Sequence, residues 1–315
     1  MLKKHFLTVL RLAGYAAFAV FAFLVSLFFL FPYPSLSQYL VAQAKQANLH
    51  LQIDSLKPSF LGVEAQGIYI SPRPSKPDVD IGSFHVDSLS IKPNLFFSKL
   101  TTNIKIANGN IQLTAGIFNR QNLTAHAKNV DLSRINFPAL LWALSPETYS
   151  RESITPKLEL EGVLTHAQVS FAVPKNQSTS ETNGHWNVEV DGLTLKQGTL
   201  VMPWPNSAEP IPVDLPRVVL GSLKSSASIK KGYVQVTQTK IQSQELTCEL
   251  LGNLQLAKKL IFSDANFTLR LQVQPELLGR LGMLGSAVSL LPVDPQDEAW
   301  RKAQFSGQIS RLKMK

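Results

Sequence analysis

Cysteine and charged residues are both scarce in this sequence. Cys248 is the single cysteine in 315 residues, so no internal disulfide can form. A small secreted scaffold held together by disulfides is therefore excluded. Charged residues make up 17% of the chain, below the roughly 25% of an average globular protein. The low charge favours a sheet-rich body with a surface of serine, threonine, asparagine and glutamine over a helical enzyme.

The lone cysteine lies among apolar residues at alternate positions, Leu246, Cys248 and Leu250. In a strand such alternation places the three side chains on one face. The stretch lacks the basic neighbours that would lower the pKa of a thiol. We therefore predict a buried apolar side chain at Cys248 rather than a reactive thiol.

Recognised catalytic signatures are also absent. The sequence has no His-Glu-x-x-His, Gly-x-Ser-x-Gly or Walker loop. Its histidines are scattered, and a metal site built from His50, His85 and His126 is an alternative to the commoner surface role of isolated strand histidines. We therefore expect no enzyme activity, no catalytic residues, no metal and no cofactor.

An acidic cluster near the C-terminus comprises Asp294, Asp297 and Glu298. Carboxylates stabilise the positive N-terminal end of a helix, so we expect a helix to begin here, ahead of Trp300. A carboxylate pair for acid–base catalysis would need a pocket, which this exposed-looking run does not indicate.

Positive charge is in modest excess and lacks a dense cluster. The net charge is +9, of which Lys3, Lys4 and Arg11 supply three at the N-terminus. A nucleic-acid interface needs basic residues gathered on one patch, so nucleic acid is not an expected partner. The remaining excess fits either an anionic lipid surface nearby or an ordinary solvated surface.

The longest apolar run occupies residues 12–31, and no charged residue occurs between Arg11 and Lys45. Twenty helical residues extend about 30 Å, the thickness of the hydrocarbon core of a bilayer. We predict a transmembrane helix here, the alternative being a buried core helix. The side chains expected to contact lipid along this helix include Leu12, Phe18, Phe23, Leu27 and Phe31.

The apolar run is longer than the core of a cleaved signal peptide, and no Ala-x-Ala cleavage site follows it. We interpret it as an uncleaved signal anchor. Because basic residues remain on the cytoplasmic side, we expect residues 1–11 to form a cytoplasmic tail. Residues 32–315 then form one β-rich domain outside the cytoplasm. The segment 203–216, which contains five prolines, is the candidate for an internal boundary and is expected to lack regular structure.

Apolar residues change their period after the anchor. Residues 36–48 have helical spacing, and from Leu49 onward apolar and polar residues alternate, as in half-buried strands. The dipeptides Asn108-Gly109 and Asp191-Gly192 predict tight hairpin turns. The fold class predicted is mainly β, a single transmembrane helix followed by a long, twisted antiparallel sheet with a few short helices. The apolar face of such a sheet must be covered by a second sheet, helices, a partner or lipid.

Residues 275–291 have helical spacing instead, although glycines weaken the pattern. We expect a short helix that caps the sheet, with contact to lipid or a partner as the alternative. The segments 174–184 and 203–216 are further contact candidates. The apolar side chains that would make the contact from the helix are Leu277, Leu278, Leu281, Leu284 and Val288.

Short islands of the sequence resemble the GspN family of type II secretion proteins. They are Phe31-Pro32-Tyr33, the stretches 57–63 and 215–223, and the later Glu245-Leu246 and 251–254, with Gln244 in place of the family's usual acidic residue. The islands are distributed over most of the chain, and none is a catalytic signature. The positions that carry the resemblance are Pro32, Tyr33, Pro58, Ser59, Phe60, Gly62, Val63, Pro216, Leu220, Gly221, Leu223, Glu245, Leu246 and Gly252.

This resemblance implies a single-pass protein of the bacterial inner membrane with a cytoplasmic N-terminus and a periplasmic β-rich body. Its expected role is a non-enzymatic structural or assembly component of the type II secretion apparatus, with other components of that apparatus as partners. The anchor, short helix and sheet are also similar to the start of AsmA-like envelope proteins. That similarity implies the alternative function, binding or transfer of phospholipid along an apolar β-groove.

Overall fold

The structure is a computed structural model that describes most of the chain after the predicted anchor. The described residues are 32–59, 62–72, 82–94, 98–116, 122–137, 139–140, 159–172, 181–202, 211–257, 262–311 and 313–314, with isolated positions before residue 32. Phe18 is described as helical and 69% exposed. Leu12, Phe23, Leu27 and Phe31 lie outside the described residues. Among the residues that are described, no helix is both long and apolar enough to cross a bilayer.

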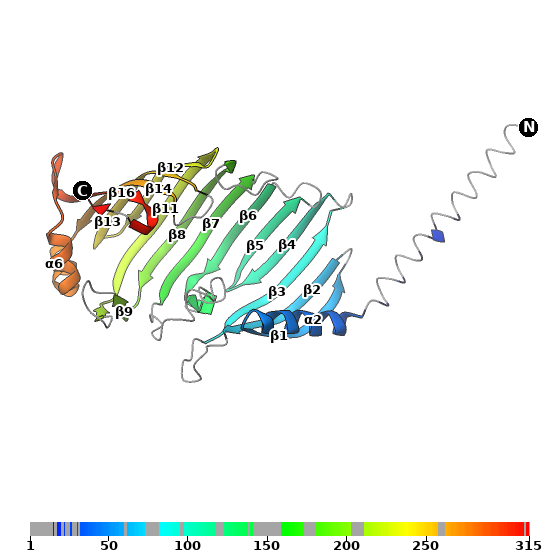
Figure 1. Cartoon of the computed structure of the whole chain (residues 1–315). Helices are drawn as coiled ribbons and strands as arrows, with labels where there is room; N and C mark the ends of the chain where they lie inside the picture. Colours follow the sequence, from blue (N-terminus) through cyan, green and yellow to red (C-terminus); the bar gives the residue numbers. More distant parts are fainter. Residues whose placement is uncertain are drawn as a thin grey trace, which may run out of the picture.

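One long antiparallel sheet dominates the molecule (Figure 1). It has 15 strands, and most neighbours in the sheet are also neighbours in sequence. This confirms the predicted antiparallel sheet with few short helices. Its strands are β1 (Leu49–Ser59), β2 (Gly62–Pro72), β3 (Phe84–Pro93), β4 (Lys99–Ile106), β5 (Gly109–Gly116), β6 (Asn122–Asp131), β7 (Leu160–Ala172), β8 (Asn183–Leu195), β11 (Val218–Lys230), β12 (Tyr233–Gln242), β13 (Leu246–Gln255), β14 (Asp264–Val273), β15 (Val293–Asp294), β16 (Asp297–Gln308) and β17 (Lys313–Met314).

A separate two-stranded sheet interrupts this simple order. Its strands β9 (Gly198–Met202) and β10 (Ile211–Leu215) pair with each other, so β8 pairs with β11 in the main sheet. The prediction that residues 203–216 lack regular structure is therefore wrong for β10. Residues 203–210 lie outside the described part of the chain.

Helix α2 (Tyr33–Gln46) precedes the sheet and contacts β1 (Figure 1). The predicted helix at 36–48 is confirmed, with a start three residues earlier. Pro34 is compatible with this early start, because the first turn of a helix does not need the proline N–H. Ala47 and Asn48 connect α2 to β1, and the positive φ of Asn48 reverses the chain direction.

The helical segment after β14 is divided in two. Helix α5 (Pro275–Arg280) and helix α6 (Met283–Ser289) are separated at Gly282, which has a φ of 56°. Glycine adopts this left-handed conformation at little cost. The prediction of one helix over 275–291 is therefore wrong in its continuity and right in its helical character.

The acidic cluster does not start a helix. Asp294 ends β15, Asp297 begins β16, and the two residues are register partners across a turn. Trp300 lies in β16, whose long pairing with β14 outweighs the local preference of carboxylates for a helix start. The predicted helix ahead of Trp300 is wrong.

The two predicted hairpins have different outcomes. Ala107 and Asn108 both have positive φ and form the two-residue turn between β4 and β5, which confirms the first hairpin. Gly192 instead lies inside β8 with a φ of 65°, next to a register shift against β7. Asp191-Gly192 is therefore a β-bulge within one strand, and the second hairpin prediction is wrong.

Candidate functional site

The sheet has one polar face, which the pairing register makes visible as a row of facing residues. Each member pairs with the next across neighbouring strands from β1 to β12. Every member is a polar or charged residue. The row is Lys57, Glu64, Ser90, Asn103, Gln112, His126, Gln168, Asn187, Ser226 and Gln238.

The other side of the sheet is apolar. Successive residues of a strand point to opposite faces, so the neighbours of the polar row belong to this second side, here called the apolar face. Its central row is Val63, Ile91, Thr102, Leu113, Ala125, Val169, Trp186, Ala227, Val236, Gly252, Phe267 and Phe305, paired from β2 to β16.

Much of the apolar face is only partly covered. Leu113, Val169, Trp186 and Phe267 are half-buried, whereas Ala227 is 4% exposed. Figure 1 shows the strands as a single curved layer. Large connected apolar surfaces on soluble domains mark binding sites for partners, ligands or membranes. The apolar face is therefore the candidate site.

Two denser clusters lie on this face. The first surrounds Val130, which is 1% exposed, and includes apolar residues from β1 to β7. The second includes Ile229 and Val236, with Trp186 and Phe267 packed against it. Both clusters are built from neighbouring strands, so curvature of the sheet lets adjacent side chains cover one another.

Three polar groups on the apolar face form hydrogen bonds with one another. Trp186 donates its indole N–H to the Ser225 hydroxyl at 3.2 Å, and Ser225 and Thr239 share a hydrogen bond of 2.8 Å. Buried polar groups cost free energy unless they find partners. The sequence could not identify this arrangement, because the three residues come from three different strands.

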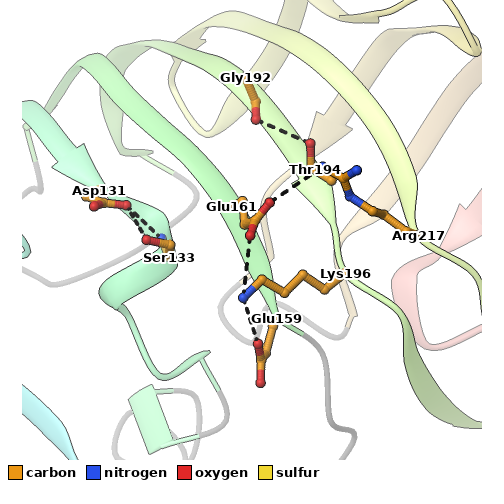
Figure 2. Close-up of polar contacts among 8 residues, drawn as sticks. All are labelled: Asp131, Ser133, Glu159, Glu161, Gly192, Thr194, Lys196 and Arg217. Carbon is orange, nitrogen blue, oxygen red and sulfur yellow. Dashed lines mark hydrogen bonds and ion pairs between the residues drawn. The ribbon is translucent and has the colours of Figure 1, made fainter.

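One end of the sheet carries ion pairs. We call it the paired end; it is the end at which β8 finishes and β11 begins. Figure 2 shows Lys196 between two carboxylates, with its ammonium nitrogen 3.1 Å from Glu159 and 3.5 Å from Glu161. Arg217 also approaches Glu161, at 3.9 Å. Glu159 and Glu161 raise the pKa of Lys196, with the hydrogen bond to Glu159 as the largest cause. Because the groups are exposed, each pair contributes little to stability.

A hydrogen-bonded turn lies beside these pairs at the end of β6, also drawn in Figure 2. The Ser133 hydroxyl and backbone N–H donate to one Asp131 oxygen at 2.6 and 3.0 Å. These bonds lower the pKa of Asp131. The carboxylate caps the short 3₁₀ helix η1 (Leu132–Arg134).

A more enclosed ionic cluster is centred on Arg270 in β14. Its guanidinium donates to Asp294 at 2.8 Å, lies 3.4 Å from Glu249 and stacks 4.7 Å from the centre of the Trp300 ring. Asp294 is 1% exposed and also accepts the Gln296 backbone N–H. That backbone hydrogen bond is the largest cause of the lowered pKa of Asp294, followed by Arg270. Asp294 of the acidic cluster thus has a structural role.

Two of the sequence islands meet at the paired end. Glu245 accepts the backbone N–H of Val219 at 2.9 Å and forms an ion pair with Arg280 of α5. Arg280 also donates to the backbone carbonyl of Arg217 at 3.3 Å. Glu245 therefore joins the start of β11, the turn before β13 and α5.

Two of the motif glycines are required by close backbone approaches. Gly221 has a φ of 75°, and a Cβ there would lie 2.1 Å from the Gln242 carbonyl oxygen. Gly252 has a φ of 147°, and its Cβ would lie 2.2 Å from the Asn266 carbonyl oxygen. Gly252 lies within β13.

The motif residues of the first two islands are placed far from this meeting point. Pro32 and Tyr33 stand at the start of α2. Pro58 and Ser59 end β1, Gly62 and Val63 begin β2, and Phe60 lies outside the described residues. Of the remaining motif positions, Pro216 precedes β11, Leu220 and Leu223 lie in β11, and Leu246 begins β13.

The predicted contact helix is partly buried. Leu277 is 1% exposed, so its side chain packs inside the molecule. Leu278, Leu281, Leu284 and Val288 are half-buried. The exposed apolar side chains here are instead Met283, at 56%, and Leu290, at 86%. Sequence reasoning missed both because the break at Gly282 changes which side chains face outward.

The described residues hold no group of three or more histidine, cysteine or acidic side chains arranged to bind a metal. His50, His85 and His126 belong to three separate strands, and His85 stacks on Tyr69 at 4.5 Å. Cys248 is half-buried on the apolar face, where burial raises the pKa of its thiol.

Fold and site together define a class of protein: a one-layer antiparallel sheet with a polar face, an apolar face and structural ion pairs at one end. No protein-family model, curated protein or solved structure matches the chain.

Proposed function

We propose that this chain is a non-enzymatic, membrane-anchored protein of the bacterial envelope that holds phospholipid acyl chains along its apolar face. The observation that supports this proposal is that polar and apolar rows alternate across the main sheet, so that one face is apolar. An acyl chain is flexible and has no hydrogen-bonding groups, so it fits a long surface of Val, Leu, Trp and Phe side chains. Burial of such surface contributes about 25 cal/mol per Å².

Anchoring by residues 12–31 is part of the same proposal. The described positions in this stretch are helical, and Tyr15, Phe18 and Leu30 are 75%, 69% and 81% exposed. Aromatic and aliphatic side chains of this kind are stable when lipid surrounds them. The proposed location is the inner membrane, with residues 1–11 in the cytoplasm and residues 32–315 in the periplasm.

Adjacent residues of β7 supply a matched test of lipid binding. Val169 and Gln168 are both half-buried and lie on opposite faces of one strand. A photo-crosslinking amino acid is introduced at each position in the full-length protein, cells are irradiated, and adducts are identified by mass spectrometry. We expect phospholipid adducts from position 169 and few from position 168.

Equal lipid adducts from both positions, or none from position 169, would contradict the proposal. A second measurement is the phospholipid that co-purifies with the protein. Val169→Gln should lower its amount several-fold, whereas Gln168→Ala should leave it unchanged. Circular dichroism of each variant separates lost binding from lost folding.

A role in type II secretion is a second candidate, supported by the resemblance and by the meeting of two islands at Glu245. In that role the paired end contacts other components of the apparatus. Deletion of the gene should then block export of folded proteins across the outer membrane. Photo-crosslinkers near Arg217 should also capture a secretion component. Intact export after deletion would exclude this candidate.

A further inference from the structure

The end of the sheet opposite the paired end concentrates basic side chains. We call it the cationic end; it is the end at which β1, β3 and β11 finish and β4 and β12 begin. The described carboxylates there are Glu64, Glu181 and Asp264. The described basic residues there are Lys57, Lys92, Lys99, Lys230, Lys231, Arg311 and Lys313.

These basic side chains form no salt bridge in the part of the fold that the structure describes. Among the described residues, no ion pair involves any of them, and each ion pair that does form lies toward the paired end. Lys57, Lys99, Lys230 and Lys231 are exposed. A group of unpaired lysines at one end leaves a local positive potential that an anionic partner can neutralise.

The lysines within the strands also share one face. Lys57 belongs to the polar row, Lys92 follows Ser90 by two residues, and Lys99 and Lys230 stand an even number of residues from Asn103 and Ser226. All four therefore project from the polar face. Contact through them leaves the apolar face free.

The direction of α2 relates the cationic end to the membrane. The two-residue connection Ala47–Asn48 turns the chain back, so α2 lies along β1 in the opposite direction (Figure 1). Because β1 begins at the paired end, the start of α2 at Tyr33 is directed toward the cationic end. A helix of 14 residues covers about 21 Å of the roughly 36 Å length of β1. The predicted anchor therefore joins α2 on the cationic side.

We propose that the cationic end rests on the anionic phospholipid headgroups of the membrane in which the chain is anchored. This inference rests on the proposed anchoring but not on lipid occupancy of the apolar face. Each lysine that reaches an anionic membrane strengthens association about fivefold. Docking would hold the sheet upright and place one end of the apolar face beside the leaflet.

Two positions on β12 give a matched test. Tyr233 begins this strand at the cationic end, and Gln242 finishes it at the paired end, about 30 Å away. In full-length protein carrying Cys248→Ala, Tyr233→Cys or Gln242→Cys is labelled with a fluorophore. The protein is reconstituted into lipid nanodiscs whose headgroups carry a short-range nitroxide quencher, with or without phosphatidylglycerol.

We expect strong quenching at position 233 and weak quenching at position 242 in discs that contain phosphatidylglycerol. The difference should diminish in phosphatidylcholine discs and when ionic strength rises from about 0.05 to about 0.5 M. The triple variant Lys99→Gln, Lys230→Gln and Lys231→Gln should shift the docking equilibrium about a hundredfold, from three lysines at fivefold each. The matched control Arg134→Gln, Lys196→Gln and Arg217→Gln removes equal charge from the paired end and should retain quenching.

Equal quenching at positions 233 and 242, or quenching independent of phosphatidylglycerol, would overturn the inference. Crosslinks from the cationic end to an acidic protein in cells, without quenching in discs, would also overturn it. Failure of the chain to remain with the discs at high salt would overturn the proposed anchoring, and this inference with it. An inserted chain without selective quenching would overturn the docking alone.

Discussion

The two ends of the sheet are made from the same strands but treat charge in opposite ways. At the paired end, Glu245 and Asp294 each combine an arginine partner with a backbone N–H. At the cationic end, no described lysine forms an ion pair. The comparison teaches that charge at one end stabilises the fold, whereas charge at the other remains available for contact outside it.

The paired end connects segments that strand pairing alone would leave loose. α5, the turn before β13 and the start of β11 all converge on Glu245. At the cationic end the two-residue connection Lys231–Gly232 joins β11 directly to β12. It therefore needs fewer side-chain contacts to keep its shape.

The largest expected effect comes from the backbone at the paired end. Gly221→Ala would place a Cβ 2.1 Å from the Gln242 carbonyl oxygen at a φ of 75°. We expect a loss of about 3 kcal/mol in unfolding free energy, because the strand must shift and the residue is strained. Urea unfolding of the full chain in neutral detergent, followed by circular dichroism, measures this loss.

Gly279→Ala is the control for that substitution. Gly279 lies in α5 at the same end, and a Cβ there would meet nothing within 4 Å. Alanine should stabilise the helix by about 0.5 to 1 kcal/mol. Similar destabilisation by the two substitutions would mean that the close approach at Gly221 is unimportant.

The second largest expected effect is at Asp294, which is buried and accepts hydrogen bonds from Arg270 and from the Gln296 backbone N–H. Asp294→Ala should cost about 2 kcal/mol at pH 7, since it removes charge-assisted hydrogen bonds. The exposed neighbour Glu298→Ala should change stability by less than about 0.5 kcal/mol. Urea unfolding followed by circular dichroism measures both changes.

The lowered pKa of Asp294 adds a pH signature to this comparison. A carboxyl whose folded pKa lies below its unfolded value of about 3.9 stabilises the fold above that value. The stabilisation disappears as pH falls through the folded pKa. The gap between the wild-type protein and Asp294→Ala should therefore shrink below about pH 4. A gap that remains constant down to pH 2 would contradict the assigned ion pair.

Local sequence signals predicted the sheet but not all of its turns. Asn108-Gly109 and Asp191-Gly192 are similar dipeptides, yet only the first forms a hairpin. β8 pairs with both β7 and β11 over most of its length, and this pairing accommodates Gly192 as a bulge. The balance between turn preference and two-sided pairing depends on neighbours distant in sequence, so the dipeptide alone could not reveal it.

The two faces of the sheet could be predicted from the sequence, whereas the cationic end could not. Alternation within one strand, as in Leu49, Leu51 and Ile53, is local and visible in sequence. The cationic end is not local, because Lys57, Lys99 and Lys230 are brought together only by strand lengths and register. In sequence they are spread without a dense run, which is why the positive excess carried no specific interpretation.

The smallest expected effect is the difference in unfolding free energy between variants that remove charge from one end or the other. The cationic-end triple variant, Lys99→Gln, Lys230→Gln and Lys231→Gln, should change unfolding free energy by less than about 0.5 kcal/mol, because these side chains have no ion-pair partner among the described residues.

The control with equal charge loss, Arg134→Gln, Lys196→Gln and Arg217→Gln, breaks exposed pairs with Asp131, Glu159 and Glu161. It should cost about 1 kcal/mol in total, since exposed pairs contribute a few tenths each. Added salt should narrow the difference by screening those pairs. Equal losses of unfolding free energy in the two triple variants would mean that the lysines of the cationic end stabilise the fold. The claim that these lysines are available to lipid headgroups would then be wrong.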